Sequence, residues 1–143
     1  MEKRAIASRS DIELLVNSLY EKVKKDDLIG FIFNDVAKVD WSHHLPIMYR
    51  FWESLLLDTN SYGRNAMDPH FRLNKLVPLE PAYFDRWLAL FEATVAEHFS
   101  GDKAALAVTR ARSIKGIMAL KMNRINHPGP DKNIPLVNPD NNQ

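Results

Sequence analysis

Apolar residues recur at intervals of three or four through most of the chain, and this spacing constrains the fold more than any other feature. In a helix, residues three or four apart share one face, whereas the side chains of a strand alternate between two faces. No stretch of the sequence has the alternating pattern of a strand, and there are no internal repeats. The sequence therefore predicts an all-α protein.

Four substantial helices and one short helix account for the spacing. The first begins at a predicted capping box of Ser10 and Glu13, the second follows Asp40 as its N-cap, and the fourth starts at Pro81. The expected helices cover roughly 10–26, 41–59, 68–76, 81–99 and 103–124. Between the first two, the letters "FIFNDV" form a short aromatic corner.

The length of 143 residues and the hydrophobic content of 45% suit one domain with a single core. We expect this domain to span 1–126, with residues 1–9 as a short frayed leader. The segment 127–143 carries four prolines and little to bury, so we expect a disordered C-terminal tail.

Composition excludes several classes of site. The chain has no cysteine, which rules out disulfides, thiolate catalysis and Cys-based metal sites. A formal net charge of +1 without a basic helix face gives no reason to expect nucleic-acid binding. No apolar run is long enough for a membrane span or a signal peptide, so we expect a soluble, cytoplasmic protein.

Four residues with polar atoms lie in or beside the apolar stripes of these helices: Tyr20, His44, His70 and Trp87. His44 sits inside the stripe of "WSHHLPIMYRFW" (41–52), whereas His43 lies off its centre. Each of the four has a plain structural explanation by itself, as a core or surface side chain. Their joint occurrence is the stronger signal, because one protein family uses all four positions.

The chain resembles the truncated haemoglobins, specifically their third group. The segment "LYEKVKKDDLIGFIFN" (19–34) is similar to the B helix of that group and the following turn, and "WSHHLPIMYRFW" is similar to its E helix with the Phe51–Trp52 pair. "YGRNAMDPH" (62–70) resembles the segment that leads to the proximal histidine, and "FDRWLALFEATVAEHF" (84–99) resembles the G helix. The glycine pairs of the first two groups are absent, which fits the third group. The proline that commonly follows Tyr62–Gly63 is also absent, so the loop before His70 is expected to differ in shape.

The resemblance implies a two-on-two helical sandwich, with B/E and G/H helix pairs around haem b. His70 is then the proximal iron ligand, and Tyr20, His44 and Trp87 face a bound ligand on the distal side. The resemblance also places Phe33 and Met48 at the cofactor. The apolar stripes add Phe51 and Ile114, and Arg72 is a candidate cation for the haem carboxylates. The same stripes add Phe84, Leu88 and Met118 as candidate walls, and candidate cations for the two haem carboxylates also include Arg64, Lys75 and Lys115.

Three functional hypotheses follow. The first is a monomeric globin that reversibly binds O₂ and other diatomic ligands such as CO and NO, with strong distal hydrogen bonds that disfavour simple oxygen storage. The second is a haem enzyme on the same scaffold, for NO dioxygenation or peroxide chemistry, which needs an electron donor or reductase. The third is a haem-free helical interaction module. The sequence does not separate ligand binding from catalysis.

Overall fold

The computed structural model describes residues 3–57 and 67–128, and the regular structure in these ranges is helical. The α-helices are α1 (Arg9–Lys25), α2 (Trp41–Leu57), α3 (Met67–Leu76), α4 (Pro81–His98) and α5 (Asp102–Asn126). A π-helical turn, η1 (Ile32–Val36), forms the predicted aromatic corner. The all-α prediction is confirmed, and the helix ends differ from the expected ones by a few residues.

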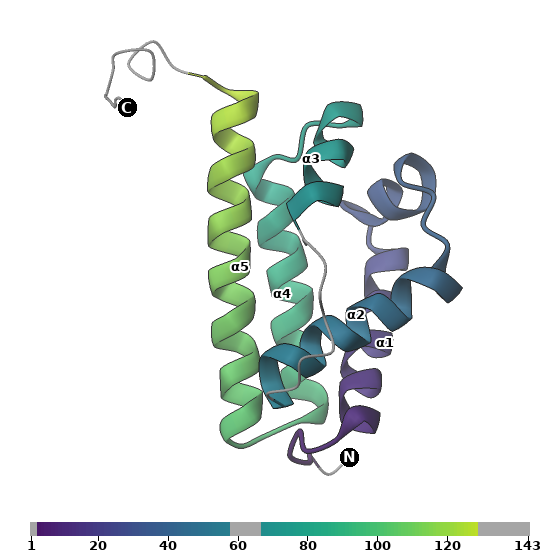
Figure 1. The fold of residues 1–143 in the computed structure, drawn as a ribbon, viewed down its shortest axis with the longest axis vertical. Helices are drawn as coiled ribbons and strands as arrows, with labels where there is room; N and C mark the ends of the chain where they lie inside the picture. Colours follow the sequence, from purple (N-terminus) through teal and green to yellow (C-terminus); the bar gives the residue numbers. More distant parts are fainter. Residues whose placement is uncertain (1–2, 58–66, 129–143) are drawn as a thin grey trace.

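The helices form two packed pairs. Helices α4 and α5 run side by side along the long axis of the molecule, and α2 crosses α1 obliquely (Figure 1). Helix α1 also packs against α4, which joins the two pairs, and the short α3 lies near the upper end of α4 and α5 in this view. This arrangement agrees with the predicted two-on-two sandwich.

The start of α1 differs from the prediction. The helix begins at Arg9, and its capping box consists of Ser8 and Asp11 instead of Ser10 and Glu13. The Asp11 carboxylate accepts hydrogen bonds from the backbone N–H of Ala7 at 2.9 Å and of Ser8 at 3.1 Å. An acidic side chain at the third helical position satisfies N–H groups that the helix leaves unpaired. The helix is therefore capped by the predicted type of capping box, two residues earlier than expected.

The expectation of a frayed leader is wrong for residues 3–8. Ile6 is only 2% exposed. The Arg4 backbone N–H donates to the carbonyl of His98 at 3.1 Å, and the Arg4 carbonyl accepts from Ser100 at 3.0 Å. The leader is therefore tied to the end of α4, a contact between distant parts of the chain that local patterns do not reveal.

The corner after α1 is held by Asp26. Its carboxylate accepts hydrogen bonds from the backbone N–H of Leu28 and Ile29, both at 3.0 Å. Arg86 of α4 donates to the same carboxylate at 2.8 Å. The turn that leads to η1 is thus fixed to α4 as well as to α1.

Helices α1 and α2 bury their apolar faces to different extents. The predicted stripe of α1 is buried along its length, including Leu15, Leu19 and Val23. In α2 only Trp52 and Leu56 are buried, and the rest of its stripe, including His44 and Met48, is half-buried. An apolar helix face packs fully only where another element covers it, so this difference points to a hollow in front of α2.

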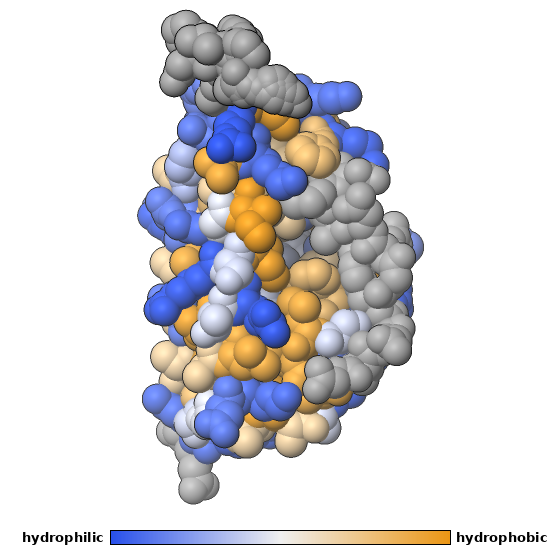
Figure 2. All heavy atoms as spheres, turned by 60° about the vertical axis from the view of Figure 1, so that its left-hand side comes forward, coloured by the Kyte–Doolittle hydropathy of each residue, from blue (hydrophilic) through white to orange (hydrophobic). Residues whose placement is uncertain are grey.

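Parts of three predictions fall outside the described residues: the loop after Tyr62–Gly63, the side chain of Arg64 and the tail beyond residue 128. The side where α5 comes forward is a mosaic of charged and apolar side chains (Figure 2), and the large exposed apolar residues of α5 are Ile117, Leu120 and Ile125. Within the ranges 3–57 and 67–128, no helix combines the length and apolar character that crossing a membrane requires.

Candidate functional site

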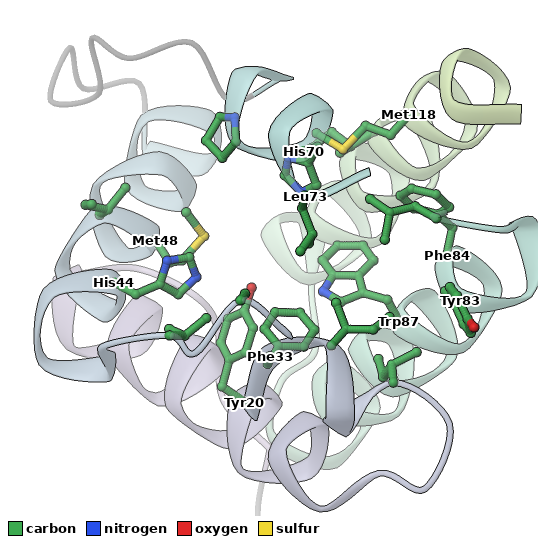
Figure 3. Close-up of a pocket in the computed structure, with 18 of the residues that line it drawn as sticks. Tyr20, Phe33, His44, Met48, His70, Leu73, Tyr83, Phe84, Trp87 and Met118 are labelled. Carbon is green, nitrogen blue, oxygen red and sulfur yellow. The ribbon is translucent and has the colours of Figure 1, made fainter. Parts of the chain in front are cut away.

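A cavity of about 660 Å³ lies in front of α2, and all five helices and η1 contribute to its lining (Figure 3). Its volume falls within the range of small-molecule and cofactor sites, roughly 300–1,000 Å³. Most of the lining is apolar, and the few polar side chains come from different helices. A largely apolar hollow with a small number of convergent polar groups is the usual form of a ligand-binding site.

Tyr20 enters the cavity from α1. Its ring is buried, and its hydroxyl points into the hollow (Figure 3). Burial raises the pKa of Tyr20 to about 12, and a hydrogen bond with the Trp87 side chain acts in the opposite direction. Because an indole N–H can only donate, the Tyr20 oxygen is the acceptor of that bond. The phenol therefore stays protonated at neutral pH and keeps its own O–H to donate.

His44 and His70 face the same hollow from different helices, α2 and α3 (Figure 3). Burial lowers the pKa of His44 below its ordinary value of 6.5, and the nearby charges of His70 and His43 lower it further. The ring of His44 also meets the ring of Tyr20 edge-on, with centroids 5.8 Å apart. His44 is thus a neutral imidazole at pH 7, beside the Tyr20 hydroxyl.

An aromatic cluster supports Tyr20 and His44 from behind. Trp41, at the start of α2, lies 5.3 Å from the Tyr20 ring and 5.7 Å from the His44 ring between centroids. Phe33 of η1 stacks on Trp41 at 6.1 Å with an interplanar angle of 19°, and Lys24 Nζ lies 4.8 Å from the Trp41 centroid. The stripe of α2 predicted that Trp41 faces inward, but its contact with Tyr20 depends on how α2 crosses α1.

His70 lies on α3 and is half-buried. Pro69 precedes it and Leu73 follows about one helical turn later, and all three line the cavity. The side chains of His70 and Leu73 point into the hollow (Figure 3). A proline near the first turn fixes its own φ at little cost in hydrogen bonds, and the helix then sets the direction of His70.

The residues that line the cavity are largely those that the sequence places on apolar helix faces. Nine side chains are expected at the site from the resemblance, the apolar stripes and the candidate cations, and all nine line this one cavity: Tyr20, Phe33, His44, Met48, Phe51, His70, Arg72, Trp87 and Ile114. Phe84 and Met118 line it as well, whereas Leu88 does not. The roles assigned to the nine residues remain predictions, because position alone does not test them.

Several lining residues were not predicted. They are mostly apolar side chains from the corner, from α2 and from the segment before and at the start of α4: Ile29, Ile32, Ile47, Leu79 and Tyr83. Ile29 and Leu79 precede their neighbouring helices in segments without a helical period, so the sequence carries no signal for their direction. Ile47 is adjacent to the predicted lining residue Met48, and a wider helical face would have included it.

Two of the four candidate cations lie at the cavity. Arg72 of α3 and Lys115 of α5 contribute to its lining, and Lys115 forms an ion pair with Asp85 at 2.8 Å. Lys75 is exposed and is not part of the lining. Positive charge is therefore available at the cavity from both α3 and α5.

The helix pairs and this cavity between them define a helical globin fold of the truncated type. No family model matches the sequence. The chain is 28% identical over 110 residues to the group 3 truncated haemoglobin ctb of Campylobacter jejuni, an alignment that covers 75% of this chain and 84% of that protein.

The structure is similar to the crystal structure of the group III truncated haemoglobin from Campylobacter jejuni, with a TM-score of 0.73 and 27% sequence identity. The superposition covers 85% of this chain and 95% of the other chain. Sequence and structure thus confirm the predicted resemblance to the third group of truncated haemoglobins.

Proposed function

We propose that the cavity holds haem b with His70 as its axial ligand, and that the protein reversibly binds O₂, CO and NO there. The observation that carries this proposal is the convergence of one imidazole from α3 with the Tyr20 hydroxyl and the His44 imidazole on a single apolar cavity. The name truncated haemoglobin, which both comparisons return for the similar protein of Campylobacter jejuni, supports it.

The residues present fit a flat apolar cofactor with two carboxylates. Met48, Phe51, Phe84, Ile114 and Met118 offer apolar surface from three helices. Arg72 and Lys115 offer cations, and charge-assisted hydrogen bonds are the usual partners of carboxylates. A macrocycle that brings four iron ligands of its own needs one imidazole from the protein, and His70 supplies it.

Haem supplies the iron that takes up a diatomic ligand, and the chain's own residues decide how long the ligand stays. Tyr20 remains protonated because burial raises its pKa to about 12. Its oxygen accepts from Trp87, which strengthens the hydroxyl as a donor, since hydrogen bonds in a chain polarise one another. A donor of this kind in a dry pocket holds a polar ligand by about 1–3 kcal/mol, and slow ligand release follows.

The test is a titration of the purified full-length chain with haemin, followed by reduction and addition of CO. We expect a saturable Soret band at one haem per chain and the spectrum of a histidine-ligated CO complex. His70→Ala is expected to lose specific axial ligation. The matched control is His43→Ala, because His43 also lines the cavity but is exposed and carries no role in the proposal.

Absence of a Soret band in the unsubstituted chain would contradict the proposal and favour the haem-free interaction module. An unchanged spectrum in His70→Ala would contradict the axial role of that residue alone. The enzymatic alternative, NO dioxygenation or peroxide chemistry, requires an external electron donor in addition. It remains a prediction, as do the monomeric state and the cytoplasmic location.

A further inference from the structure

Helix α3, which carries His70, has an unusual buried residue. Among its described side chains, 69–76, the only buried one is the polar residue Asn74, which is 7% exposed. Its apolar residues Phe71 and Leu73 are half-buried, and Leu76 is exposed. Helices are normally held by buried apolar side chains. In α3, Phe71 and Leu73 pack against the core but stay only partly buried, so the buried polar contact of Asn74 adds a second constraint on the helix.

Asn74 forms a reciprocal amide pair with Asn126, the last residue of α5. The Asn74 amide donates to Asn126 Oδ1 at 2.9 Å, and the Asn126 amide donates back to Asn74 Oδ1 at 3.0 Å. The backbone N–H of Leu79 also donates to Asn74 Oδ1, at 2.8 Å. Asn74 thus links α3, the segment before α4 and the end of α5.

The pair sets the rotation of α3 about its own axis. Asn74 follows His70 by four residues, about one helical turn, so the two side chains leave the helix in similar directions. Two antiparallel hydrogen bonds between amides have a narrow geometry, and a rotated helix would bury the Asn74 amide without partners. A buried unpaired amide is costly, so one orientation of α3 is selected, and with it one direction of His70.

The same end of α5 is tied to α4 by a second contact. His127 Nε2 lies 2.9 Å from a carboxylate oxygen of Glu80, which precedes α4. The end of α5 is therefore held against α3 through Asn126 and against the segment before α4 through His127. It forms a fixed point against which α3 is oriented.

We propose that Asn74 and Asn126 are positioning residues that aim His70 at the cofactor through the orientation of α3. This inference rests on the proposed haem-binding function. It assigns a role to two residues that lie outside the cavity lining. The pair acts as a clamp, in the sense that breaking it frees α3 to rotate while the rest of the fold stays intact.

The experiment compares Asn126→Leu with the unsubstituted full-length chain in two forms. In the haem-free form, amide hydrogen exchange is expected to accelerate about tenfold in α3 and to stay unchanged in α1 and α4, because local openings are governed by local contacts. In the haem-loaded ferrous form, the iron–histidine stretching band in the resonance Raman spectrum is expected to shift and broaden, and haem affinity to fall about tenfold.

Two further variants separate positioning from general stability. Asn123→Leu makes the same chemical change one turn earlier on α5, outside the pair, and is expected to change neither measurement. Asn126→Gln keeps an amide that donates and accepts, and is expected to restore most of the iron–histidine band. A merely structural role would instead lower the midpoint of unfolding and leave the band in place.

The outcomes distinguish the clamp from the function on which it rests. If the amide hydrogens of α3 exchange at equal rates in Asn126→Leu and in the unsubstituted chain, the clamp is overturned. This includes the case in which α3 is unprotected in both chains. Faster exchange with an unchanged iron–histidine band overturns the positioning role. A chain that takes up no haem overturns the proposed function, and the exchange arm then still supports or overturns the clamp.

Discussion

The cavity has two walls that are held in different ways. The wall behind Tyr20 and His44 rests on buried apolar residues of α1 and on an aromatic cluster, with ring centroids 5.3–6.1 Å apart. The wall that carries His70 belongs to α3, whose buried side chain among residues 69–76 is an asparagine. The first wall is continuous with fully buried residues of the hydrophobic core. The second wall packs against the core only through half-buried side chains and is held in addition by the hydrogen bonds of Asn74.

Because the two walls are held differently, we expect substitutions in the first to change the stability of the fold and substitutions in the second to change the iron ligation by His70. Burial of apolar surface supplies most of the free energy of folding, so changes in the aromatic wall should act on stability first. Hydrogen bonds contribute little net free energy but specify one geometry. Changes on α3 should therefore act on the direction of His70 more than on the stability of the fold.

The largest effect is expected for Phe91→Ala. Phe91 of α4 is fully buried in the same hydrophobic core as the α1 residues that support the first wall. Its ring lies 4.8 Å from Trp52 and 5.4 Å from Trp87 between centroids. Removal of a buried ring leaves a void, and the free energy of unfolding should fall by about 3–5 kcal/mol. The measurement is urea denaturation of the haem-free chain. Phe31→Ala is the matched control, since Phe31 is 38% exposed, and should cost about 1 kcal/mol or less. Equal losses would contradict the assignment of Phe91 to the core.

Alkaline pH should weaken the fold through Tyr20. Burial raises the pKa of Tyr20 from 10.0 to about 12, so the folded state resists ionisation of the phenol more than the unfolded state does. The resulting stabilisation is complete below pH 10 and is lost as the pH rises through 12. A shift of two pKa units corresponds to about 3 kcal/mol. Urea denaturation across this range should show a smaller loss of stability in Tyr20→Phe than in the unsubstituted chain.

Tyr20→Phe should also release O₂ faster. Loss of the hydroxyl removes one donor at the ligand, which is worth about 1–3 kcal/mol and predicts an off-rate ten- to a hundredfold higher. Trp87→Phe should have a smaller effect, because the indole N–H acts through the Tyr20 oxygen. Stopped-flow displacement of O₂ by CO measures both rates. A larger effect from Trp87→Phe would reverse this order and make the indole the direct donor.

The helices could be predicted because their apolar period is a local property of the sequence. The contacts that orient the site could not be predicted, because they join residues far apart in the chain. The period of three or four placed Tyr20 and His44 on inward faces, and Pro69 and the following residues indicated the helix of His70. The Asn74–Asn126 pair joins residues 52 positions apart, and neither asparagine stands out in the sequence. The same holds for Arg4 against the end of α4 and for Trp41 against Tyr20, since both contacts depend on how separate helices cross.

Leu73→Ala tests the second wall with a modest expected effect. Leu73 lines the cavity one turn after Pro69 but is only half-buried, so the free energy of unfolding of the haem-free chain should fall by about 1 kcal/mol. Haem affinity should fall together with it, because Leu73 offers apolar surface beside His70. Urea denaturation and haemin titration of the same samples give both quantities. A loss of stability as large as that of Phe91→Ala would erase the proposed difference between the walls.

The smallest effect concerns the pKa of His44, through which the first wall interacts electrostatically with His70 of the second wall. Burial lowers its pKa below 6.5, and the charges of His70 and His43 lower it further. Since the folded pKa lies below the unfolded one, the stabilisation is complete above pH 6.5 and is lost as the pH falls through the folded value. Nuclear magnetic resonance titration of the haem-free chain should give a pKa for His44 that rises toward 6.5 in His70→Ala but stays below it, because burial remains. An unchanged pKa would mean that α3 does not hold His70 near His44, and the second wall would then be looser than the hydrogen bonds of Asn74 imply.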